Sequence, residues 1–201
     1  MEDLAQNPAT MALLMANLIV SFAGFASRQI FDDNVFWIGP MRQDKQYYRA
    51  LSSGFLHVNP PHLILNMYVL VMFGVVLESW IGIQGFLLVY FAALLGGSLW
   101  SYKDNKDNPD YRAAGASGAT SGIVCAFCLY APFAQLSFFG VPMPALVFAV
   151  GYIGLSYYFS RRGGGLIGHD AHLGGALAGI AMAIFIRPDS VGNLLDQLAG
   201  F

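Results

Sequence analysis

The feature that most constrains this chain is a long run without charge. Residues 113–160 contain no Asp, Glu, Lys or Arg. About 20 apolar residues in an α-helix cross the core of a bilayer, so this run is long enough for two crossings. Gly140, Pro142 and Pro144 interrupt it, and these residue types favour a turn. We therefore predict one span before this turn and one after it.

Other apolar segments point to the same solvent. Hydrophobic residues make up 56% of the 201 residues and charged residues only 11%, whereas a soluble domain carries about 25% charged residues. A chain in lipid must satisfy its own backbone hydrogen bonds, and helices do so within each segment. The sequence thus predicts an all-α, polytopic membrane protein, a single domain over residues 1–201. Its six predicted transmembrane helices cover residues 10–26, 62–77, 80–100, 117–132, 144–159 and 171–186.

The composition excludes some classes of function. The net charge is −2 and the pI about 6, so a basic surface for nucleic acid is not expected. Cys125 and Cys128 lie in an apolar run, where packing is a better explanation than redox chemistry. No Lys, Arg, Asp or Glu falls inside a predicted span, which argues against a transporter or channel that moves ions along charged groups. The connection over residues 28–59 mixes apolar and charged residues, and either an interfacial segment or a loop with its own small core explains it.

Polar side chains at membrane depth are the candidates for chemistry. His62 and Asn66 are four residues apart and share a helix face; they either form an ordinary interhelical hydrogen bond or donate to a developing anion. Ser117 stands at the first turn of a predicted helix, where backbone N–H groups are unpaired and the dipole favours negative charge. His172 opens the last predicted span and is followed by glycines that permit close helix contact. If these two helices touch, His172 can take the proton of Ser117.

Three motifs in this order resemble the rhomboid family of intramembrane serine proteases. They are His62-Leu63-Ile64-Leu65-Asn66, Gly115-Ala116-Ser117-Gly118 and Ala171-His172-Leu173-Gly174-Gly175. The resemblance covers nearly the whole chain and is to the basic six-helix bacterial form. It implies a catalytic dyad of Ser117 and His172. It also implies an oxyanion hole made by the Ser117 N–H group with the side chains of His62 and Asn66.

The resemblance also assigns supporting parts. His57 matches a further histidine at the mouth of the site, with a structural role, and Gly115 and Gly118 flank the serine. Asp170 is not expected to complete a triad. The segment Gly163-Gly164-Gly165 would belong to a cap loop, and the fifth helix would be a lateral gate for substrate.

Two positions depart from the family pattern. Many members carry an aromatic residue four positions after the serine, where it packs on the dyad histidine. This chain has Ser121 there, so His172 is held less firmly or by a different neighbour. The first connection carries Tyr48-Arg49 where Trp-Arg is frequent, a milder change.

The expected activity is therefore that of a serine endopeptidase that cuts transmembrane segments of other membrane proteins, without a metal or other cofactor. Its expected partners are transmembrane substrates and the lipid bilayer, and its expected location is the bacterial inner membrane. The alternative is a rhomboid-like protein that binds membrane proteins without cutting them. Such proteins usually lack the serine or the histidine, and this chain has both.

The charge pattern and the resemblance disagree about orientation. Of the ten Lys and Arg residues, only Arg187 lies in a connection on the side opposite Ser117 and His172. The positive-inside rule would place the charged side, and the site, in the cytoplasm. The family arrangement places the site toward the exterior. We expect the family arrangement.

Overall fold

The computed structural model describes residues 4–138, 140–162 and 168–200, and most of these are helical. The larger helices are α1 (Pro8–Ala26), α5 (Pro60–Asn105), α6 (Ser117–Tyr130), α7 (Ala145–Arg162), α8 (His169–Ile186) and α9 (Asp189–Ala199). Shorter elements are η1 (Leu4–Gln6), α2 (Arg28–Asn34), α3 (Ile38–Gln43), α4 (Arg49–Ser52) and η2 (Ser53–Phe55). Strands β1 (Phe36–Trp37), β2 (Arg112–Ala113), β3 (Gln135–Phe138) and β4 (Val141–Pro144) form two small antiparallel pairs. The all-α expectation therefore holds for the bulk of the fold but missed these two ribbons.

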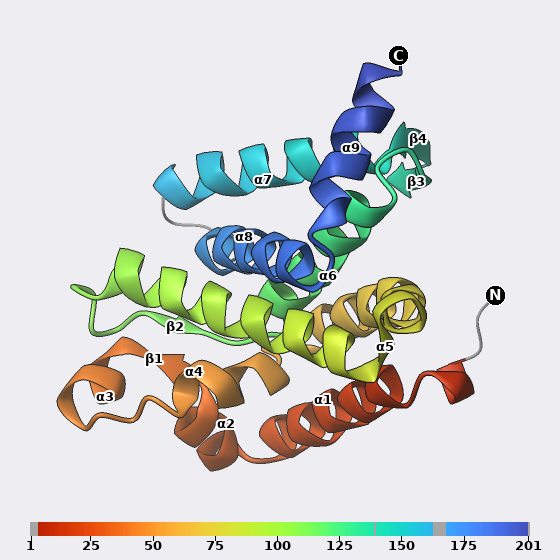
Figure 1. Cartoon of the computed structure of the whole chain (residues 1–201). Coiled ribbons are helices and arrows are strands. Elements are labelled where there is room, and N and C mark those ends of the chain that lie inside the picture. The colour runs from red at the N-terminus through yellow and green to blue at the C-terminus, as the bar shows by residue number, and fades with distance from the viewer. Residues whose placement is uncertain (1–3, 139, 163–167, 201) are drawn as a thin grey trace.

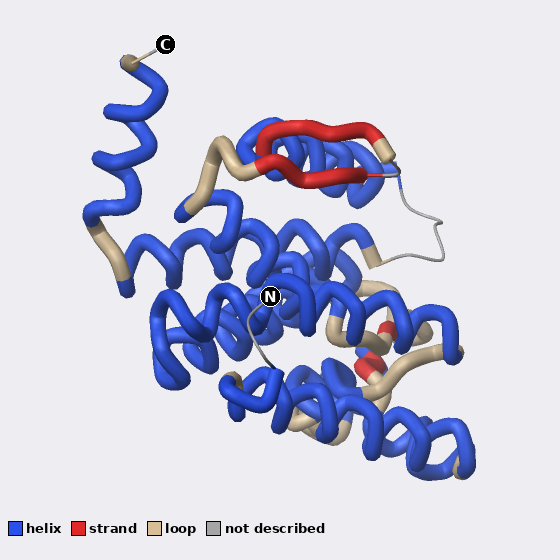
Figure 2. Tube along the Cα trace, turned by 90° about the vertical axis from the view of Figure 1, so that its right-hand side faces the viewer, coloured by secondary structure: helices blue, strands red, loops and turns tan. Residues whose placement is uncertain are grey.

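The helices pack in layers. Figure 1 shows α6 and α8 between α5 on one side and α7 on the other, with α1 beyond α5. Figure 2 shows the β3–β4 hairpin close to α7, and α9 projecting from the layers toward the C-terminus. The main core is formed by apolar side chains of α1, α5, α6 and α8. Residues 189–199 lie beyond the last predicted span and form α9.

The element α5 joins two predicted spans. Asn59 caps its start by accepting a hydrogen bond from the His62 backbone N–H at 2.9 Å, and Pro60 and Pro61 occupy the first turn, as prolines can where no N–H is needed. At Gly82 the backbone leaves the helical region, with φ 71° and ψ 171°, a conformation that glycine adopts without strain. The arms before and after Gly82 contribute to the same core.

Within the part of the chain that the structure describes, three helices are long and apolar enough to cross a membrane, namely α1, α5 and α8. Helix α6 and the segment 145–160 of α7 are apolar but shorter. The predicted count of six crossings is therefore not confirmed by helix length. The predicted break at Gly140 to Pro144 is confirmed, because the β3–β4 hairpin lies there and Gly140 has a φ of 80°.

A buried carboxylate fastens α1 to α5. Glu78 is only 3% exposed. Its two carboxylate oxygens accept from the backbone N–H groups of Ala9 and Thr10 at 3.0 and 2.7 Å, and one also accepts from the Thr10 hydroxyl at 2.7 Å. A carboxylate at a helix N-terminus satisfies unpaired donors and complements the dipole. The sequence reasoning placed Glu78 between two spans and missed this role.

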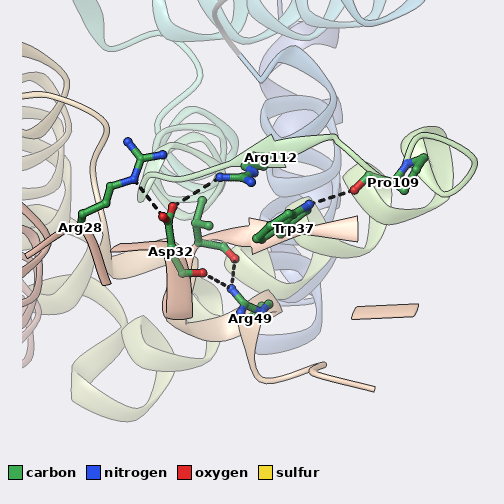
Figure 3. A network of polar contacts seen from close by, with 7 residues as sticks. Arg28, Asp32, Trp37, Arg49, Pro109 and Arg112 are labelled. Atoms are coloured by element: carbon green, nitrogen blue, oxygen red, sulfur yellow. Dashed lines mark hydrogen bonds and ion pairs between the residues drawn. The ribbon is translucent and has the colours of Figure 1, made fainter. Parts of the chain in front are cut away.

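The connection over residues 28–59 has a small core of its own, made by Phe36, Ile38 and Met41. Figure 3 shows the polar network beside it. Arg49 is only 4% exposed. Its guanidinium donates to the backbone carbonyls of Asp32 and Val35 at 2.7 and 2.9 Å. Arg112, the first residue of β2, places its guanidinium carbon over the ring of Trp37, 3.6 Å from the ring centroid. This network joins the first connection to the segment that leads to Ser117.

Candidate functional site

Close helix crossings bring the candidate residues around Ser117 into one region. A Cβ added at Gly179 would lie 2.4 Å from the Cα of Gly122, and one added at Gly175 would lie 2.1 Å from the carbonyl oxygen of Gly118. No side chain fits such approaches, so α6 and α8 touch through their backbones. The contact between these two helices, on which a proton transfer from Ser117 to His172 depends, is therefore present. It carries Ser117, at the start of α6, to the first turn of α8, which holds His172.

A cavity of about 1040 Å³ lies at this end of the helices. Its lining includes Ser117, His172, His62 and Asn66 together with Gly115 and Gly118. These residues come from α5, α6, α8 and the segment before α6. Six of the seven candidate residues thus border the same cavity, in which Ser117 and His172 are half-buried. His57, expected at the mouth of the site, is instead fully buried.

Gly115 is required by two features of its position. Its φ is +140°, which side chains rarely adopt, and an added Cβ would lie 2.5 Å from the ring of His62. Its backbone N–H donates to the Ser53 carbonyl at 3.0 Å. The glycine therefore makes room for His62 two residues before Ser117, where α6 begins.

His57 holds the segment before Ser117. It is fully buried, and its Nδ1 lies 2.8 Å from the hydroxyl of Ser21, whose own proton is donated to the Phe55 carbonyl. Nδ1 must therefore be the donor to Ser21, which leaves Nε2 to accept from the Ala116 backbone N–H at 3.4 Å. Burial, with a smaller contribution from His62, lowers the pKa of His57 to about 3. A neutral His57 thus connects Ser21 on α1 to the backbone of Ala116, directly before α6. These contacts are structural.

Asn66 and His62 face the cavity from the first arm of α5. The Asn66 side-chain carbonyl accepts from the Thr120 hydroxyl at 3.1 Å, and its amide donates to the His62 carbonyl at 3.0 Å. The Asn66 amide carries a second N–H group, which is not needed for the hydrogen bond to the His62 carbonyl. Among residues 4–138, 140–162 and 168–200, the buried Nδ1 of His62 has no hydrogen-bond partner. Sequence reasoning missed Thr120, although it lies three residues after Ser117 and therefore on a neighbouring helix face.

The Asp170 side chain is held by Asn105 and Tyr111. Its carboxylate accepts from the Asn105 amide at 2.7 Å and from the Tyr111 hydroxyl at 2.8 Å. These contacts fasten the start of α8 to the end of α5 and to the following connection. This geometry agrees with the expectation that Asp170 completes no triad. The Gly163-Gly164-Gly165 segment, expected to be a cap loop, lies outside the described residues.

Comparison with known proteins identifies the family. A family model described as "Rhomboid domain" matches residues 44–189, which is most of the chain. The chain belongs to the rhomboid family. Family membership makes it an integral membrane protein.

Several rhomboid proteins are similar to this chain. RHOMBOID-like protein 12, mitochondrial, of Arabidopsis thaliana is 29% identical over 91% of this chain and 60% of its own length. Presenilin-associated rhomboid-like protein, mitochondrial, of Homo sapiens is 32% identical over 65% of this chain and 35% of its own. Rhomboid protease GluP of Bacillus subtilis is 30% identical over 69% of this chain and 26% of its own. The chain thus spans less than two thirds of each of these relatives.

These names do not support the expected bacterial inner membrane. The relatives from Arabidopsis thaliana and Homo sapiens are named as mitochondrial proteins, and the relative from Bacillus subtilis is bacterial.

Proposed function

We propose that this rhomboid protein is a serine endopeptidase that cuts transmembrane segments of other membrane proteins. The observation that carries the proposal is the shared cavity, which Ser117, His172, His62 and Asn66 border together. The proposal includes a single domain with six crossings: α1, the two arms of α5 on either side of Gly82, α6, α7 and α8. The similarity to a relative named as a protease adds support.

The reaction follows from the chemistry of these side chains. The Ser117 hydroxyl oxygen attacks a peptide carbonyl carbon while His172 accepts the hydroxyl proton. The negative charge that develops on the carbonyl oxygen is stabilised by the Ser117 backbone N–H, at the positive end of α6, and by donors from Asn66 and His62. His172 then protonates the leaving amine, and the peptide bond breaks. Water, deprotonated by His172, releases the acyl group from Ser117.

Replacing the nucleophile is the direct test. We expect Ser117→Ala to abolish both cleavage of a model transmembrane substrate and labelling by a fluorophosphonate probe. We expect His62→Ala to lower turnover by about 100- to 1000-fold, the usual effect of losing one oxyanion donor. Cleavage would be followed by gel electrophoresis with purified protein in proteoliposomes.

Two outcomes would contradict the proposal. Full activity of Ser117→Ala would exclude Ser117 as nucleophile. A folded wild-type protein that neither cleaves nor reacts with the probe, but retains a membrane-protein partner, would favour the non-catalytic alternative.

A further inference from the structure

The ring of Tyr152, on α7, lies against the ring of His172. The two ring centroids are 6.2 Å apart and the planes differ by 21°, within the range of a stacked aromatic pair. Ser121, four residues after Ser117, is where many rhomboid proteins carry the aromatic residue that packs on this histidine. The small side chain of Ser121 leaves the space that a neighbouring helix fills with Tyr152.

The hydroxyl of Tyr152 reaches the other half of the proposed dyad. It lies 2.5 Å from the Ser121 hydroxyl, which itself lies 2.5 Å from the Ser117 backbone carbonyl. A carbonyl only accepts, so Ser121 must donate to Ser117, and the Tyr152 hydroxyl must donate to Ser121. One side chain of α7 therefore contacts His172 directly and Ser117 through one hydrogen-bonded hydroxyl.

The contact belongs to a wider aromatic face of α7. Phe148 stacks on Tyr152 with centroids 5.9 Å apart, and Phe159 stacks on His169 with centroids 5.0 Å apart. These three α7 residues are separated by four and seven positions and so lie on one helix face. His169 in turn meets His172 edge to face at 5.8 Å. Both histidines in the first turn of α8 are thus in contact with rings from α7.

We propose that Tyr152 is the positioning residue for His172, replacing from α7 the aromatic contact that α6 lacks at Ser121. The proposal rests on the proposed protease function and deepens it. Its consequence is that the position of α7 sets the alignment of the dyad. A sideways displacement of α7 withdraws the Tyr152 ring from His172 and separates its hydroxyl from Ser121.

The test compares loss of the ring with loss of the hydroxyl. Tyr152→Phe keeps the ring, and we expect its fluorophosphonate labelling rate to stay within about fivefold of wild type, the effect of one hydrogen bond. Tyr152→Leu removes the ring, and we expect the labelling rate to fall about 10- to 100-fold, as small misplacements of a catalytic group do. With a peptide substrate, kcat should fall in Tyr152→Leu while KM stays close to wild type. Leu155→Ala, on the same helix with a side chain 59% exposed, is the matched control and should label at the wild-type rate.

A positional exchange sharpens the comparison. In the double variant Ser121→Tyr and Tyr152→Ser the aromatic ring comes from α6, and the labelling rate should recover toward that of Tyr152→Phe. A wild-type rate in Tyr152→Leu, an equal loss in Tyr152→Phe and Tyr152→Leu, or an exchange variant no faster than Tyr152→Leu would each overturn the proposal.

A stability measurement separates this proposal from the proposed function. Melting temperatures of wild type, Tyr152→Leu, His172→Ala and the double variant form a cycle that needs no activity. We expect the two single changes to be non-additive, because each removes the same ring contact. If the changes are non-additive in a protein without protease activity, the Tyr152–His172 contact is supported and only the proposed function is rejected. If the changes are additive, the role of Tyr152 is rejected.

Discussion

At the scale of single residues, the neutral state of His57 is fixed by its hydrogen bonds. Nδ1 donates to Ser21 and Nε2 accepts from the Ala116 N–H, so a second ring proton would face a donor. The pKa in the folded protein, about 3, is below the ordinary value of 6.5. The unfolded chain therefore binds one more proton than the folded chain between these values, and stability falls as the pH falls through this window.

This linkage predicts a pH-dependent effect of replacing His57. The melting temperature of the wild type in detergent should decrease as the pH is lowered from about 6.5 toward about 3. His57→Gln should have a lower melting temperature at neutral pH but a shallower decrease on acidification, because the titrating group is gone. Parallel slopes in the two proteins would show that His57 does not titrate differently on unfolding.

At the scale of elements, the crossing of α6 and α8 depends on glycine. The Gly122–Gly179 and Gly118–Gly175 approaches leave no room for a Cβ on α8, and the proposed dyad lies on the first turns of these two helices. Any side chain at the crossing forces the helices apart and moves Ser117 relative to His172.

Gly179→Ala tests this contact. We expect a loss of about 1–3 kcal/mol of stability, typical of overpacking, and a reduced fluorophosphonate labelling rate. Gly154→Ala on α7 is the matched control, because a Cβ there meets no atom within 4 Å; it should be neutral or slightly stabilising, since alanine is the better helix former. Equal melting temperatures for the two variants would contradict the account.

At the scale of the whole molecule, the site and α9 lie at opposite ends of the helices. Ser117 and Asp170 are near the end of α5, whereas Arg187 donates to the carbonyl of Trp80 close to the bend at Gly82. Both ends are therefore available as reporters of orientation.

Cysteine labelling decides which end faces outward. We expect Lys103→Cys to react with a membrane-impermeant maleimide added outside sealed cells, and Asn193→Cys to react only after lysis. Both positions are exposed and the two native cysteines are buried, so each variant carries one reactive thiol. The reverse pattern would mean that the positive-inside rule prevails over the family arrangement.

The kind of protein and most of its helices can be predicted from the amino-acid sequence. Charge-free runs specify which segments can leave water, and Asn59-Pro60-Pro61 and Gly140 to Pro144 mark boundaries through local backbone preferences. These signals are local, so they can be read along the chain. The motif residues Ser117, His172, His62 and Asn66 were found in the same way, and the structure places them around one cavity.

The contacts that support those residues become visible when the helices are packed together. Three such contacts join different helices. The Tyr152 ring packs on His172, the Thr120 hydroxyl donates to Asn66, and the Glu78 carboxylate accepts from the start of α1. Each contact joins residues that lie far apart in the sequence, so no local pattern along the chain predicts it. From Ser121 the sequence predicts that α6 offers no aromatic ring to His172. The packing of α7 against α8 is what brings the ring of Tyr152 to that histidine.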